Sequence, residues 1–142
     1  MTDALPRRKR IRAMIWIVLL LVFIVGWELA WKAAGVQPMF PWELKRRLRE
    51  RPESVALIDV RTPLEYQLFH IPGSKHRPDL LGKENPSIPA DPDRDVVMIC
   101  MTGHRSPVAG YGLKDQRPGR VYNLVWGMVG WKLVGGASVS AK

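Results

Sequence analysis

The strongest hydrophobic pattern in the chain lies near its N-terminus. Residues 13–27 carry no charged side chain, and apolar residues resume after Glu28, so that 13–31 forms one nearly continuous apolar span. At a helical rise of about 1.5 Å per residue, this span is about 28 Å long, close to the hydrocarbon thickness of a bilayer. No polar stripe interrupts it, which argues against a helix packed on a soluble core. The sequence therefore predicts one transmembrane helix over 13–31.

A cleaved signal sequence is the alternative interpretation of this span, because small residues follow it at 33–35. Bulky Trp31 and charged Lys32 stand directly before these positions and favour an uncleaved anchor. Residues 1–12 contain five basic side chains, so the positive-inside rule predicts a basic cytoplasmic N-terminus. The rest of the chain would then lie outside, which is the periplasm if the source is bacterial. Further basic residues within 45–51 weaken this asymmetry in part.

Beyond the span, short apolar runs alternate with segments of helical character. The runs typical of buried parallel strands are 55–58, 96–99 and 121–124, and the predicted helices are 41–50, 63–69 and 106–116. Strands that alternate with helices predict an α/β domain with a central, mainly parallel sheet. The predicted division is a linker over 32–39, one domain over 40–134, and a C-terminal tail over 135–142.

Charge and cysteine content restrict the chemistry of this domain. The formal net charge is +9, which favours small anions and acidic lipid surfaces as partners. Basic and aromatic residues are not interleaved in a nucleic-acid-binding pattern, so no nucleic-acid partner is expected. A single cysteine excludes an internal disulfide and a cysteine-based zinc site. We expect neither a metal nor a cofactor.

That cysteine, Cys100, stands between the run 96–99 and the predicted helix 106–116. A thiolate there is stabilised by the free amides at a helix start and by a nearby guanidinium, which Arg105 supplies. The alternative is a small buried residue at a strand end, because free cysteine is often buried. The position is therefore a candidate nucleophile.

Several separated motifs accompany the cysteine loop. They are LIDVRTPLEY at 57–66, HIPGS at 70–74, and VYNL at 121–124 followed by Gly127 and Trp131. In this order, the set resembles the rhodanese domain, a sulfurtransferase family, over most of 40–134. The resemblance implies a three-layer rhodanese-like fold and a persulfide carried by the cysteine.

The resemblance also implies roles for individual residues. Cys100 and Arg105 would be catalytic, as the nucleophile and as the cation that orients an anionic donor. The loop residues Met101, Thr102, Gly103 and His104 would bind substrate, and Asp59, Arg61 and Glu65 would give structural support near the loop. His104 adds positive charge if it protonates, although it equally suits an exposed position.

The leading hypothesis is a membrane-anchored sulfurtransferase that moves sulfane sulfur from a small anionic donor, such as thiosulfate, to a thiol or cyanide. Lipid would contact the N-terminal helix. A persulfide carrier or partner-binding module without turnover is one alternative. A cysteine-dependent phosphatase or arsenate reductase is another, but related loops of that kind are one residue longer than the four residues between Cys100 and Arg105.

Overall fold

The computed structural model describes residues 7–82, 88 and 93–140. The chain divides into two compact units, Met1–Ala30 and Trp31–Lys142. Helix α1 covers Arg7–Ala33 and contains the whole predicted span 13–31. It begins earlier than predicted because the arginines and lysine before the span are good helix formers. By length and composition α1 could cross a membrane, although a signal sequence near an N-terminus meets the same criteria.

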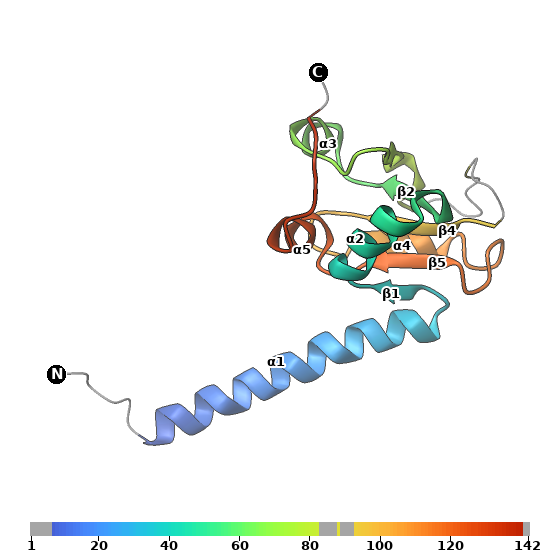
Figure 1. The fold of residues 1–142 in the computed structure, drawn as a ribbon. Helices are drawn as coiled ribbons and strands as arrows, with labels where there is room; N and C mark the ends of the chain where they lie inside the picture. Colours follow the sequence, from blue (N-terminus) through green and yellow to red (C-terminus); the bar gives the residue numbers. More distant parts are fainter. Residues whose placement is uncertain (1–6, 83–87, 89–92, 141–142) are drawn as a thin grey trace. The chain divides into compact units, whose positions relative to one another are not determined.

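The second unit is built on a five-stranded sheet in which each neighbouring pair of strands is parallel. The strands are β1 (Gln37–Met39), β2 (Val55–Asp59), β3 (Lys75–His76), β4 (Asp95–Ile99) and β5 (Val121–Leu124). Their order across the sheet is β1-β5-β4-β2-β3, with the longest strands at the centre (Figure 1). The predicted α/β class with a parallel sheet is confirmed.

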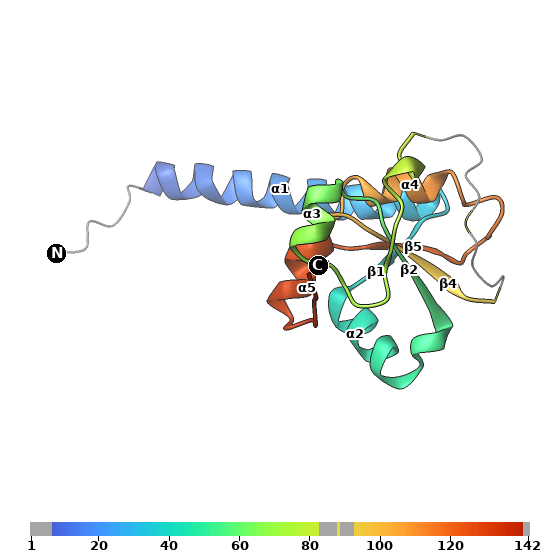
Figure 2. The same ribbon diagram turned by 90° about the horizontal axis from the view of Figure 1, so that it is seen from above.

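Helices cover both faces of this sheet. The helices of this unit are α2 (Pro41–Glu50), α3 (Pro63–Leu68), α4 (Ser106–Tyr111) and α5 (Gly127–Leu133), with short 3-10 turns at Pro52–Ser54 and Pro78–Leu80. Residues of α2, α4 and α5 are buried, whereas α3 has no buried residue. Figure 2 shows α4 on one side of the sheet and α2 on the other. Ala109 of α4 packs in the core on the first face, and Leu44 of α2 and Met128 of α5 pack on the second. The domain therefore has three layers.

Two segments expected to be irregular take part in the domain. Strand β1 lies within the predicted linker 32–39, where it pairs with β5 from Gln37 to Met39. The predicted tail also returns to the domain, because the backbones of His70 and Val139 exchange hydrogen bonds of 2.8 and 2.9 Å. Helix α4 ends at Tyr111 rather than at 116, with the poor helix former Gly112 as its C-cap.

This topology brings chemically useful residues together at one edge of the sheet. Parallel strands end at the same edge, and in open α/β sheets ligands bind beyond those carboxyl ends. Asp59 ends β2 opposite Ile99, which ends β4, so Arg61 and Cys100 both follow at that edge. The loop between β4 and α4 therefore lies at the carboxyl edge of the sheet, beyond its central strand.

Candidate active site

Cys100 continues the alternation of β4 into the loop. Val96, Met98 and Cys100 belong to the core on the α4 face, whereas Val97 and Ile99 belong to the opposite core. The cysteine is fully buried. Its carbonyl accepts a hydrogen bond of 2.9 Å from the amide of Met128, near the start of α5. Strand and helix together hold its backbone in place.

Hydrogen-bond donors surround the cysteine sulfur. The amide of Gly103 lies 3.1 Å and the hydroxyl of Ser106 3.3 Å from Sγ. Burial by itself raises the pKa of the Cys100 thiol, but the Ser106 hydroxyl and the amides of Ser106, Arg105 and Thr102 lower it further than burial raises it. The net pKa is below that of an ordinary cysteine, so the reactive thiolate is favoured.

Gly103 makes this tight loop possible. Its φ angle is +84°, a conformation that side chains disfavour, and a Cβ atom there would lie 2.8 Å from the backbone nitrogen of Trp126. The backbone of the turn after β5 thus lies in direct contact with the loop. Any larger residue at 103 would displace the amide that donates to the sulfur.

The guanidinium of Arg105 is held by an acid from another element. Its Nη2 lies 2.7 Å from Oε1 of Glu65 in α3, and the two side chains are 41% and 24% exposed. The hydrogen bond to Glu65 is the main reason that the pKa of Arg105 is raised, and the nearby Cys100 sulfur raises it further. Arg105 is therefore a fixed, partly exposed cation beside the thiol.

Glu65 is fixed in turn by the start of its own helix. Thr62 and Glu65 form a capping box, in which the amide and hydroxyl of Thr62 donate to Oε2 at 2.9 and 2.8 Å. Burial raises the pKa of Glu65, but Arg105 and Thr62 lower it more, from its ordinary value of 4.5 to about 2. The carboxylate is ionised under all but strongly acidic conditions.

Asp59 and Arg61 form a buried ion pair beneath α3. Both side chains are fully buried, with Nη2 of Arg61 2.7 Å from Oδ2 of Asp59. The guanidinium also donates to the carbonyls of Glu65 and Phe69, at 3.1 and 2.6 Å. The Phe69 carbonyl directly follows the end of α3, and the Glu65 carbonyl also accepts a hydrogen bond of 3.5 Å from the Phe69 amide, so Arg61 adds a second donor at the last turn of the helix. The pair secures the helix that carries the Arg105 partner.

The remaining predicted loop residues differ in position. Met101 is half-buried against the core on the α2 and α5 face. Thr102 and His104 are exposed, and the His104 Nδ1 lies 3.1 Å from the Thr102 hydroxyl. Thr102 reaches the sulfur through its amide rather than its side chain. Backbone groups, more than side chains, thus make up this part of the loop.

The family model for the rhodanese-like domain matches residues 41–133. This chain belongs to the rhodanese-like domain family. The predicted resemblance is therefore confirmed, and the match begins at the first residue of α2 and ends at the last residue of α5.

The proteins to which this chain is similar include two named sulfurtransferases and one possible phosphatase. A sulfurtransferase of Allochromatium vinosum is 40% identical over 89 residues, which cover 62% of this chain and 80% of the relative. The thiosulfate sulfurtransferase GlpE of Pseudomonas fluorescens is 34% identical over 97 residues, covering 65% of this chain and 82% of the relative. A solved structure from Rhodopseudomonas palustris, a protein of unknown function described as a possible tyrosine phosphatase, is 25% identical with a TM-score of 0.61. It covers 75% of this chain and 89% of its own.

Two polar residues of the rhodanese-like domain were not assigned a role from sequence. Ser106 and Asn123 are buried, and the Ser106 hydroxyl lies 2.6 Å from Oδ1 of Asn123. The amide of Asn123 donates to the carbonyl of Gly103 at 3.2 Å. A polar residue inside the otherwise buried strand 121–124 was the available signal, because buried polar side chains require partners.

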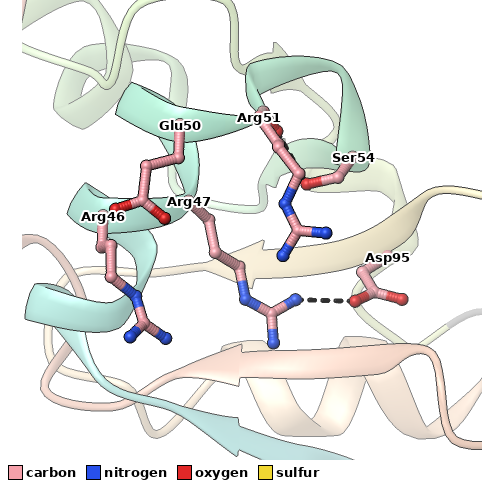
Figure 3. A pocket seen from close by; sticks show the side chains of 6 residues that line it. All are labelled: Arg46, Arg47, Glu50, Arg51, Ser54 and Asp95. Carbon is pink, nitrogen blue, oxygen red and sulfur yellow. Dashed lines mark hydrogen bonds and ion pairs between the residues drawn. The ribbon is translucent and has the colours of Figure 1, made fainter.

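A hollow outside the candidate site lies at the opposite edge of the sheet from Cys100. It has a volume of about 390 Å³ and is lined by Arg46, Arg47, Glu50, Arg51, Ser54 and Asp95 (Figure 3). Asp95 starts β4, whereas Cys100 follows the end of that strand. Arg47 donates to Asp95 at 2.7 Å and to Glu43 at 2.8 Å. Part of the positive charge of α2 is therefore balanced by one carboxylate of the same helix and one of β4.

Metal chemistry has no visible site in the described part of the chain. Among residues 7–82, 88 and 93–140, no group of three or more His, Cys, Asp or Glu side chains is placed to hold a metal ion. The reactive groups at the candidate site are the thiol, the guanidinium and the ring of donors around the sulfur.

Proposed function

We propose that this chain is a sulfurtransferase in which Cys100 accepts sulfane sulfur from a small anionic donor and passes it to a thiol or to cyanide. The observation that carries the proposal is the buried sulfur with the Gly103 amide at 3.1 Å and the Ser106 hydroxyl at 3.3 Å. Arg105 supplies a fixed positive charge beside it. The names of the Allochromatium and Pseudomonas relatives support this activity and thiosulfate as a donor.

In the first half-reaction, the Cys100 thiolate attacks the outer sulfur of thiosulfate. The sulfur–sulfur bond of the donor breaks, and its electron pair leaves on sulfite. Arg105 orients the donor, because a planar guanidinium binds two oxygens of an oxyanion at once. The enzyme is left with a persulfide on Cys100, and the lowered pKa of the thiol supplies the nucleophile.

In the second half-reaction, the acceptor attacks the terminal sulfur of the persulfide. The bond between that sulfur and Sγ breaks, and its electron pair returns to Sγ as a thiolate. A thiol acceptor becomes a persulfide, and cyanide becomes thiocyanate. The donors around Sγ stabilise the returning charge, which favours departure of Cys100 as a leaving group.

Phosphatase chemistry is the second candidate, because the Rhodopseudomonas protein of similar fold is described in those terms. Its requirement is a cysteine loop that encloses a tetrahedral phosphate. Here only four residues separate Cys100 from Arg105, which the family resemblance associates with sulfur transfer. A persulfide carrier without turnover shares the first half-reaction and differs only in the second.

We also propose that α1 is an uncleaved membrane anchor that places the domain outside the cytoplasm. Its length, its apolar composition and the basic residues before it support this arrangement. An anchored protein stays with membranes during an alkaline carbonate wash, and protease added outside then cleaves the domain. A soluble product that begins near Val36 would show a cleaved signal instead.

Mass spectrometry of the full chain in detergent tests the chemistry. After exposure to thiosulfate, we expect one added sulfur atom on Cys100, and its removal when cyanide is added. Cys100→Ser is the matched control, since serine is nearly isosteric and accepts no sulfur. Transfer retained in that variant would contradict the proposal, whereas a persulfide that no acceptor discharges would identify a carrier.

A further inference from the structure

The hydroxyl of Ser106 faces two hydrogen-bond acceptors at once. Its Oγ lies 3.3 Å from Sγ of Cys100 and 2.6 Å from Oδ1 of Asn123. A serine hydroxyl carries one proton and can therefore donate only one full hydrogen bond. The two acceptors compete for it.

Asn123 cannot avoid this competition by turning its amide over. Its Nδ2 donates to the carbonyl of Gly103 at 3.2 Å, which leaves Oδ1 as the atom that faces Ser106. Reversing the amide would place Oδ1 against a carbonyl oxygen and Nδ2 beside the hydroxyl. The side chain is 1% exposed, so water offers little compensation for such a change.

The charge on the sulfur decides which acceptor is preferred. A neutral thiol is a weak acceptor, so the shorter bond to Asn123 is favoured. A thiolate accepts a charge-assisted hydrogen bond, which is about twice as strong as a neutral one. We propose that Asn123 is a positioning residue that holds the Ser106 proton while the sulfur is neutral and yields it when the sulfur is charged.

This competition deepens the proposed function, on which it rests for the role of Cys100 as nucleophile and leaving group. When the persulfide bond breaks, the electron pair returns to Sγ, and the Ser106 hydroxyl turns from Asn123 toward the new thiolate. No proton leaves the hydroxyl. Asn123 thereby makes the thiolate less stable than Ser106 alone would make it.

The other charged or titratable groups of the loop and of the elements packed against it stay unchanged in the test. They are Arg105 from the loop with Glu65 from α3, the buried pair of Asp59 and Arg61 at the end of β2, and His104 on the exposed side of the loop. Because the comparison is made between variants that keep all of these groups, their influence on the thiol cancels.

The experiment is a double-mutant cycle on the full chain in detergent, with the pH dependence of Cys100 alkylation by iodoacetamide as the readout. Cys100 is the only cysteine, so the rate reports one thiol. Ser106→Ala should raise the pKa of the thiol, because a donor to the thiolate is lost. Asn123→Leu removes the competing acceptor. The pKa change that it causes in the wild-type chain should be more negative, by about 0.5 to 1 unit, than the change that it causes in the Ser106→Ala variant.

The Ser106→Ala background separates this effect from a structural one. Asn123→Leu also removes the bond to the Gly103 carbonyl, but it does so equally with Ser106 present or absent. The difference between the two backgrounds therefore isolates the competition. Asn123→Ala provides a second, smaller variant in case leucine does not fit, and Ser54→Ala, remote from the loop, should leave the pKa unchanged.

Equal effects of the Asn123 substitutions in both backgrounds would overturn the inference and leave Asn123 as a support for the loop alone. The inference would also be overturned if Asn123→Leu raised the pKa of Cys100 when Ser106 is present and not in the Ser106→Ala variant. Failure of sulfur transfer would not affect the result, because alkylation requires no donor or acceptor. The two proposals therefore fail separately.

Discussion

The ion pair between Glu65 and Arg105 gives a sharp test of how α3 supports the cysteine loop. Glu65→Gln keeps the size of the side chain and removes its charge. The substitution leaves Arg105 without the carboxylate that lies 2.7 Å from its Nη2. We expect lower stability, an altered response to acid and weaker binding of an anionic donor.

The magnitude follows from the pKa of Glu65, which falls from 4.5 to about 2. Such a shift corresponds to about 3 kcal/mol as an upper bound. Because the Arg105 side chain is 41% exposed, solvent screens much of this interaction, and partly exposed pairs contribute about 0.2 to 1 kcal/mol. We therefore expect a loss of about 1 kcal/mol, or a Tm lower by about 4 to 8 °C.

The same pKa predicts how this loss depends on pH. The native pKa of Glu65 lies below its unfolded value, so the stabilisation is fully present above about pH 4.5 and disappears as the pH falls toward 2. Thermal unfolding of the full chain in detergent, followed by tryptophan fluorescence, measures both limits. Equal Tm values for wild type and variant at neutral pH, or a difference that persists near pH 2, would refute the reasoning.

Kinetics of the same variant report on the site. A freed Arg105 must be ordered again by each donor, at a cost of about 0.5 to 1.5 kcal/mol, so the KM for thiosulfate should rise about 2- to 10-fold. Glu50→Gln is the matched control. Its pair with Arg49 is 3.8 Å long and exposed, so we expect changes close to zero in both Tm and KM.

Further predictions concern the guanidinium groups and the choice of chemistry. Arg105→Lys should raise the KM for thiosulfate about tenfold or more and change kcat less than kcat/KM, because lysine lacks a planar set of donors; initial rates across thiosulfate concentration test this. Asp59→Asn should lower the free energy of unfolding by about 3 to 5 kcal/mol, because it leaves the buried Arg61 charge without its carboxylate. A Tm within a few degrees of wild type would contradict this expectation. Wild-type hydrolysis of aryl phosphates should stay at background, and robust hydrolysis abolished by Cys100→Ser would favour a phosphatase.

The central strands were predictable because strands buried on both faces are apolar along their length. The runs 55–58, 96–99 and 121–124 correspond to β2, β4 and β5. The edge strands β1 and β3 have only three and two residues, and they contain Pro38 and Lys75. Their pairing depends on register with β5 and β2, which no local pattern shows.

Part of the candidate site was also predictable, because Cys100 and Arg105 share one short loop. The partners of these residues come from distant positions. Glu65 reaches Arg105 across 40 positions of the sequence, and Ser106 reaches Asn123 across 17. Such contacts follow from the parallel sheet bringing strand ends to one edge. Local periodicity places a residue on an element but does not say which side chain it meets.

The source of thiolate stabilisation differs from the expectation in one important respect. A helix over 106–116 would stabilise a thiolate through its dipole, but α4 ends at Tyr111 and contains six residues. The amides of Arg105 and Ser106, at the start of α4, lower the pKa of Cys100 as expected, but the Ser106 hydroxyl, which was assigned no role from the sequence, lowers it more. Their positions depend on the positive φ of Gly103 and on the turn that presses against it. The reactivity of the thiol should therefore depend on β5 and its following turn as much as on α4. Asn123, which we propose acts on the thiol through Ser106, lies in β5.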